Sequence, residues 1–87
     1  MNSMNAQELS LWRLRVTTDA DPGVVARVLE RFQNLNVLPR RVVAEADTNN
    51  RFRIEVDVLG MPEAQMTLVA IKLRQNTSVL NAYWHRL

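Results

Sequence analysis

Three consecutive residues, Asp21, Pro22 and Gly23, form the part of the sequence best suited to binding a small ligand or another chain. Asp21 suits a helix cap and Pro22 the first helical position, so Gly23 falls at the second, where most residues are more favourable. A glycine there leaves backbone N–H groups accessible, and N–H groups at a helix start attract negative charge. Two interpretations remain: a ligand or partner approaches the bare backbone, or the glycine permits tight packing of a strand-to-helix corner.

Catalytic and metal-binding chemistry finds little support in the sequence. His85 is the only histidine, and no carboxylate or nucleophile stands in a recognisable arrangement with it. The sequence has no cysteine, which excludes a disulfide scaffold, thiol chemistry and a cysteine-based metal site. We therefore predict a protein that is not an enzyme, with no catalytic residues, no metal and no cofactor.

The length and composition predict one small domain. The 87 residues, 47% of them hydrophobic, can bury one modest core, and domains of this size often gain stability by pairing, so we expect a homodimer. We expect residues 1–8 to be a flexible N-terminal segment and residues 9–87 to form the domain. The sequence contains neither a secretory signal nor an apolar run long enough to span a bilayer, so the expected location is cytoplasmic and no membrane partner is expected.

The charged residues give weak support for nucleic acid binding. Eleven basic residues nearly balance nine acidic ones, for a net charge of +2. Apart from Arg40-Arg41, the basic residues are spread along the chain, whereas phosphate binding calls for a concentrated patch. We therefore do not expect nucleic acid to be a partner.

Two kinds of periodicity alternate along the first half of the chain. Residues Leu11 to Thr17 are apolar at every second position, which is the period of a half-buried strand. From Pro22 to about Leu35 the apolar residues follow helical spacing, and Asn36 suits the left-handed conformation that commonly closes a helix. An extended stretch from Arg40 to Asp47 follows.

The second half of the chain repeats this alternation. Turn residues Thr48-Asn49-Asn50 lead into the clearest strand, Phe52 to Val58, so the chain forms a hairpin. Gly60 ends that strand, and a second helix runs from Pro62 to about Gln75. We expect this helix to bury Ala64, Leu68 and Ile71, with Met61 beside them. A last strand is expected from Ser78 to Trp84.

The resulting order, β-α-β-β-α-β, belongs to the α+β class and predicts a ferredoxin-like sandwich: a four-stranded antiparallel sheet with two helices on one face and the first and third strands in its centre. In that arrangement Arg13 and Arg15 lie beside Glu55 and Asp57 on the uncovered face. We expect these residues to form a ladder of opposite charges exposed to solvent.

RNA binding is an alternative for this fold class, because such sheets can stack bases on aromatic residues of the two central strands. The alternation places Trp12 and Phe52 on the side facing the helices, so the uncovered face lacks an aromatic platform on those strands. In the last strand, Tyr83 and Trp84 alternate, and one of them should point away from the helices.

The layout, and the segment from Asp21 to Phe32 in particular, resembles the ACT domain, a small regulatory module with this topology. Within that family the chain is most similar to the short regulatory subunits of acetolactate synthase, a thiamine-diphosphate enzyme of branched-chain amino acid synthesis. The resemblance extends from Leu11 to Trp84 and includes the strand Arg53 to Val58 and the pair Lys72-Leu73. It implies a non-catalytic homodimer that binds a small amino acid at the chain boundary, with the large catalytic subunit of acetolactate synthase as its partner.

The resemblance also implies a ligand site at the turn between the first strand and helix. Its candidate residues are Asp19, Ala20, Asp21, Pro22, Gly23, Val24 and Leu38. The family usually has Asp or Asn at the position of Ala20 and often Asn at that of Leu38, so this chain lacks two side-chain hydrogen bonds. The loss of each hydrogen bond would weaken ligand binding by about 1–3 kcal/mol if a buried group of the ligand were left unpaired. The alternative is a stand-alone binding module for another small ligand or RNA, without an enzyme partner.

Overall fold

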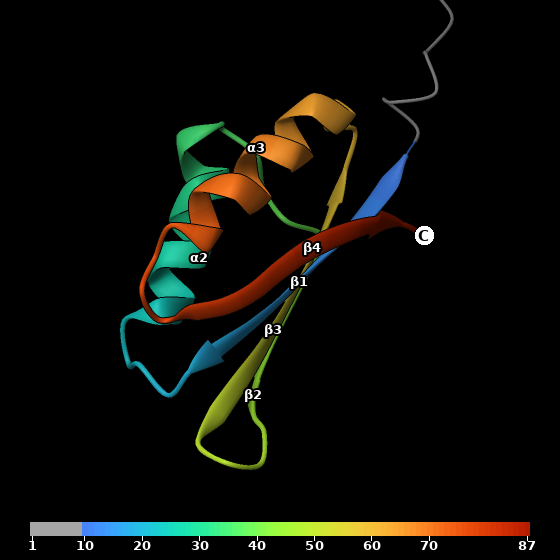
Figure 1. Cartoon of the computed structure of the whole chain (residues 1–87). Helices are drawn as coiled ribbons and strands as arrows, with labels where there is room; N and C mark the ends of the chain where they lie inside the picture. Colours follow the sequence, from blue (N-terminus) through green and yellow to red (C-terminus); the bar gives the residue numbers. More distant parts are fainter. Residues whose placement is uncertain (1–9) are drawn as a thin grey trace, which may run out of the picture.

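The computed structural model describes residues 10–87, so the expected flexible segment 1–8 lies outside the described residues. The described chain forms a four-stranded antiparallel sheet with two helices on one face (Figure 1). The elements in chain order are β1 (Leu11–Asp19), α2 (Val24–Asn34), β2 (Arg41–Ala46), β3 (Arg51–Leu59), α3 (Glu63–Arg74) and β4 (Val79–Arg86). This is the predicted α+β, ferredoxin-like arrangement.

The strands lie in the order β2-β3-β1-β4, so β1 and β3 occupy the centre as predicted. The register places Leu14 opposite Val56 and sets Arg13 opposite Asp57. Because strand side chains alternate between the two faces, this register sends the apolar residues of both strands to the helices and the charged residues to the uncovered face.

The core lies between the sheet and the two helices. Trp12, which alternation assigns to this side, is buried and donates its Nε1–H to the carbonyl of Met61 at 2.8 Å. The ring of Trp84 meets that of Trp12 edge-on, with 5.1 Å between centroids, so Trp84 belongs to the core side and the exposed Tyr83 to the uncovered face. The other large buried side chains of this core are Phe32, Leu14, Ile54, Met61 and Met66.

Helix α2 begins at Val24, two residues later than predicted. The side chain of Asp21 accepts a hydrogen bond from the N–H of Gly23, and the carbonyl of Asp21 accepts one from Val24, so a turn precedes the helix. Gly23 is therefore the residue before the helix and not its second residue. The far end follows prediction, because Asn36 adopts the left-handed conformation with φ of 57°.

The buried face of α3 differs from the predicted one. Its buried residues are Met66, Val69, Ala70 and Leu73. Leu68 is 54% exposed and Ile71 is 42% exposed, and Ala64 is exposed as well. The prediction failed because α3 is apolar on two opposite faces, and both satisfy helical spacing. Met61, just before the helix, is buried as expected.

Strand β2 is covered on neither face. It pairs only with β3, at the edge of the sheet, and its residues are exposed apart from the half-buried Val43. The β2–β3 hairpin extends past the end of the helical layer (Figure 1). Its turn contains Asn49 and Asn50, both in the left-handed conformation that asparagine tolerates. No helix within residues 10–87 is long and apolar enough to cross a membrane.

Candidate functional site

Asp21 is the centre of the turn between β1 and α2. Its Oδ1 accepts the N–H of Gly23 at 2.9 Å, while its Oδ2 accepts Nη1 of Arg27 at 2.8 Å and the hydroxyl of Ser78 at 2.7 Å. The hydrogen bond from Gly23, then that from Ser78 and the charge of Arg27, hold the pKa of Asp21 below its usual range. The carboxylate therefore stays ionised and fixes the turn against both α2 and the start of β4.

Gly23 has room for a side chain within this chain. Its φ is −88°, which any residue adopts, and a Cβ would lie 3.6 Å from the nearest atoms of Arg27 and Asp21, an ordinary contact. Its N–H is already bonded to Asp21. Tight packing of the corner therefore does not account for the glycine, and its N–H is not free for a ligand.

A hollow of about 250 Å³ opens beside this turn and is lined by Ala20, Asp21, Pro22, Val25 and Phe52. The backbone around it is held in place, because the N–H of Asp19 donates to the carbonyl of Ser78 and that of Ala20 to the carbonyl of Asn50. Three candidate residues, Ala20, Asp21 and Pro22, thus line one surface hollow. It contains the carboxylate of Asp21 and the apolar side chains of Val25 and Phe52.

The other candidate residues lie elsewhere. Val24 is buried in the core, and Asp19 is exposed at the end of β1, outside the lining of the hollow. Leu38 is 89% exposed and lines a second hollow, of about 530 Å³, beyond the C-terminal end of α2. The turn residues and Leu38 lie at opposite ends of the 11-residue α2, which at about 1.5 Å per residue is roughly 16 Å long, too far for one small amino acid to contact both.

The two hollows lie at opposite ends of one surface, which we call the α2–β2 trough. One wall is the flank of α2, where Val25 lines the first hollow and Leu29 the second. The floor is the helix-facing side of β2, which includes Val42, Ala44 and Ala46 by their register with core residues of β3. All three floor residues are exposed because no helix covers them. Sequence reasoning missed this trough, although the alternation of small apolar residues in β2 was a signal.

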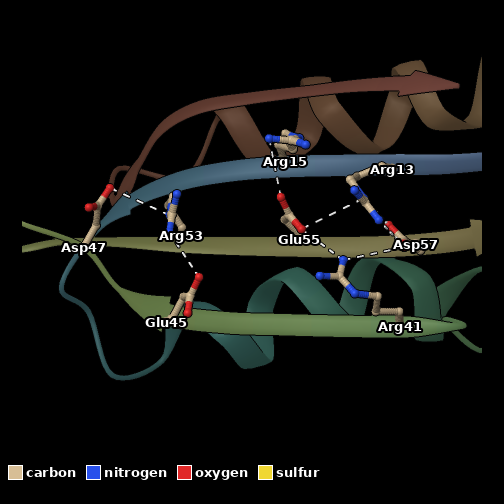
Figure 2. Close-up of polar contacts among 8 residues, drawn as sticks. All are labelled: Arg13, Arg15, Arg41, Glu45, Asp47, Arg53, Glu55 and Asp57. Atoms are coloured by element: carbon tan, nitrogen blue, oxygen red, sulfur yellow. Dashed lines mark hydrogen bonds and ion pairs between the residues drawn. The ribbon is translucent and has the colours of Figure 1, made fainter. Parts of the chain in front are cut away.

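The uncovered face of the sheet carries the predicted charge ladder (Figure 2). Arg13 donates two hydrogen bonds to Asp57, at 2.7 and 2.9 Å, and Arg15 lies 3.5 Å from Glu55. Arg41 on β2 joins the ladder, 3.0 Å from Glu55 and 3.6 Å from Asp57. Asp57 is only 5% exposed, although alternation predicts a wet position. Long arginine side chains on both sides can cover it with their apolar stems.

These ion pairs weigh against phosphate binding on the uncovered face. The hydrogen bonds from Arg13 keep the pKa of Asp57 low, and that from Arg41 does the same for Glu55, so both carboxylates remain charged partners of the arginines. Arg53 is also paired, at 3.1 Å from Glu45. In residues 10–87, no three potential metal-ligating side chains come together.

A comparison with protein families identifies the fold independently. A profile described as an ACT-like domain matches residues 3–87. The chain belongs to the ACT-like domain family. ACT domains are regulatory, non-catalytic modules, and this single domain fits that description. No match is found among curated proteins.

Several solved structures share the ACT-like fold at low sequence identity. The C-terminal domain of the MgtC protein from Mycobacterium tuberculosis has a TM-score of 0.77 at 16% identity, covering 97% of this chain and 94% of that one. The ACT domain of a GTP pyrophosphokinase from Chlorobium tepidum has a TM-score of 0.72 at 16% identity, covering 86% and 96%. The regulatory subunit of aspartate kinase from Thermus flavus has a TM-score of 0.68 at 11% identity, covering 88% and 52%. These similarities concern the fold alone.

Proposed function

We propose that this ACT-like domain is a homodimeric regulatory protein that binds a small amino acid at the boundary between its two copies. Its target is an enzyme of amino acid metabolism, with the large catalytic subunit of acetolactate synthase as the first candidate. The observation that carries the proposal is the division of the candidate residues between two hollows at opposite ends of the α2–β2 trough.

Pairing of two copies through β2 would unite the hollows. The Leu38 hollow lies near the start of β2, while the turn hollow lies near its end, since Ala46 pairs with Phe52. If two β2 strands pair in antiparallel fashion, the start of one strand lies beside the end of the other. Each Leu38 hollow then meets the turn hollow of the partner, which gives two equivalent composite sites. The free edge of β2 and the exposed apolar trough favour this pairing.

The composite site has the groups that an aliphatic amino acid requires. The carboxylate of Asp21 would supply the negative charge that attracts the ligand's ammonium group, which would share Oδ2 with Arg27 and Ser78. The first turn of α2, at Val25 and Ala26, has N–H groups without an intrahelical acceptor, which suit the ligand's carboxylate. Val25 and Phe52, with Leu38 of the second copy, supply apolar contacts for the side chain. We therefore propose valine, leucine or isoleucine as ligand.

Regulation follows from linkage. An amino acid that binds one arrangement of the dimer more tightly shifts the population toward that arrangement, and with it the attached enzyme toward the state that the arrangement favours. Because both halves of each site are needed, ligand binding and dimerisation stabilise each other.

A thermal-shift screen of the purified protein against the standard amino acids tests the ligand. At ten times its Kd, a ligand of the folded state stabilises it by about 1.4 kcal/mol, which raises the Tm by roughly 6–11 °C for a domain of this size. Ala20→Leu fills the turn hollow from an exposed position and should abolish the rise. The same substitution at the exposed Ala64, on α3, is the matched control and should leave it intact.

Absence of any rise at millimolar concentrations of valine, leucine and isoleucine would refute the proposed ligand. An equal rise in the Ala20→Leu variant would move the site away from the turn. The target is tested separately, by mixing the protein with the purified large subunit of acetolactate synthase and measuring its activity with and without the ligand. Binding of single-stranded RNA at low salt, lost at high salt, would instead support the alternative binding module.

A further inference from the structure

The outward face of α3 carries an apolar stripe that the folded chain does not use. Ala64, Leu68 and Ile71 lie directly opposite the buried face when successive residues are placed about 100° apart around the helix. Helices at a protein surface ordinarily place polar residues there. This stripe is the one that sequence periodicity assigns to the core, so it has the character of a buried surface.

Leu68 of this stripe also lines a hollow between α2 and α3, on the opposite flank of α2 from the α2–β2 trough. This hollow, of about 90 Å³, has the buried Val69 in its lining and the exposed Leu35 and Leu68 beside it. Arg31 from α2 and Lys72 from α3 complete its rim, with Asn34 and Gln65. The helical layer thus presents an apolar groove with a cation on each side.

The two cations define which partner fits. Within the described residues, neither Arg31 nor Lys72 is within ion-pair distance of a carboxylate, in contrast to Arg13, Arg41 and Arg53 on the sheet. A second copy presenting the same face would bring four of these cations to one interface, with Glu30 of each copy as the nearby carboxylate. A partner with carboxylates beside apolar side chains would instead satisfy both the cations and the stripe.

We propose that this surface, formed by Leu35, Leu68 and Ile71 and bordered by Arg31 and Lys72, binds an amphipathic helix of a partner protein that carries aliphatic residues along one face and flanking Glu or Asp residues. A helix laid between α2 and α3 inserts its aliphatic side chains into the groove and places its carboxylates against the two cations. This goes beyond the proposed amino acid site by assigning a separate surface to the partner.

The test is an NMR titration of the full-length, ¹⁵N-labelled protein with an 18-residue helical peptide that has Leu at positions i, i+4, i+7 and i+11 and Glu on both flanks. A matched peptide has Lys in place of Glu. We expect the acidic peptide to shift the amide signals of Leu68, Ile71 and Lys72 and to bind at least tenfold more tightly than the basic peptide at low salt.

Two variants make the test specific. The double variant Leu68→Ser/Ile71→Ser should weaken binding at least tenfold, whereas Leu80→Ser, an exposed leucine on β4, should not change it. Arg31→Glu/Lys72→Glu should reverse the preference, so that the basic peptide binds more tightly. All these positions lie at least partly at the surface, and dispersed amide spectra would show that the variants fold.

Equal binding of the two peptides, shifts confined to the α2–β2 trough, or no binding would overturn the inference. Shifts of Leu68 and Ile71 on concentrating the protein without peptide would also overturn it, because a second copy would then be the occupant. None of these outcomes depends on an amino acid ligand, so failure here leaves the proposed function standing, and a failed ligand screen leaves this surface standing.

Discussion

The orientation of α3 makes a sharp prediction about two leucines on the same helix. Leu73 is 2% exposed within the core, whereas Leu68 is 54% exposed on the outer stripe. Leu73→Ala removes close-packed methyl groups and leaves a cavity, which we expect to lower the free energy of unfolding by about 3 kcal/mol. Leu68→Ala removes a side chain that is half in water, and we expect a loss of about 0.5 kcal/mol or less.

Urea unfolding followed by circular dichroism measures both effects. With a slope of about 1 kcal/mol per molar urea for a domain of this length, Leu73→Ala should lower the midpoint by roughly 3 M and Leu68→Ala by roughly 0.5 M or less. The two variants are each other's control, because the change in helix propensity is the same and only the burial differs. All samples are compared at equal protein concentration, since the proposed dimer would unfold in a concentration-dependent way.

A larger loss for Leu68→Ala than for Leu73→Ala would show that α3 is turned by about half a circle relative to the structure described above, and the outer stripe would cease to exist. A large loss for Leu68→Ala that disappears on dilution would show instead that a second copy covers the stripe. The first result would refute the orientation of α3, and the second would refute the assignment of the outer stripe to a partner protein.

Gly23→Ala should stabilise the fold by about 0.4–1 kcal/mol, measured by urea unfolding, because its backbone and surroundings accept a Cβ; destabilisation would contradict this. The hydrogen bonds from Arg13 lower the folded-state pKa of Asp57. The stability that the ionised Asp57 contributes is therefore complete above about pH 4 and is lost as the pH falls through the lowered pKa. Asp57→Asn should flatten the acid limb of the curve of unfolding free energy against pH, and an unchanged limb would contradict this. Val42→Lys, in the trough floor, should shift sedimentation toward the monomer, whereas Leu80→Lys on β4 should not.

The central strands β1 and β3 were predictable because the alternation of residue types and the order of the elements both predict the same arrangement. From Trp12 to Val16 in β1 and from Arg51 to Val58 in β3, apolar and charged residues alternate without interruption, and a shift of one residue would bury arginines. The strand order follows from the ferredoxin-like topology, and the alternation places Arg13 and Arg15 on the same face as Glu55 and Asp57. The register that pairs Arg13 with Asp57 is a result of the structure. In β1 and β3 the alternation within each strand and the topology of the sheet thus predict the same buried face.

The parts that sequence missed depend on choices that local pattern leaves open. On α3, two apolar stripes satisfy the same period, and only packing against the sheet selects Met66 and Leu73. At the turn, Asp21 is bonded by Ser78, 57 residues away, a contact that no spacing rule anticipates. The division of the candidate ligand residues between two hollows also required coordinates, because a helix separates Leu38 from the turn and the sequence does not give the direction of that helix.

The bonding of Asp21 has a consequence for communication across the domain. One oxygen, Oδ2, holds both Arg27 on α2 and Ser78 at the start of β4. Arg27 also borders a hollow between the helices that Glu30, Arg31 and Lys72 line. If an ammonium group competed for this oxygen, the Arg27 guanidinium would lose its hydrogen bond to Asp21 and would be free to turn toward Glu30, and replacement of Arg27 by Met would remove the effect. A ligand at the turn would in this way change how the charges on the helical surface are paired.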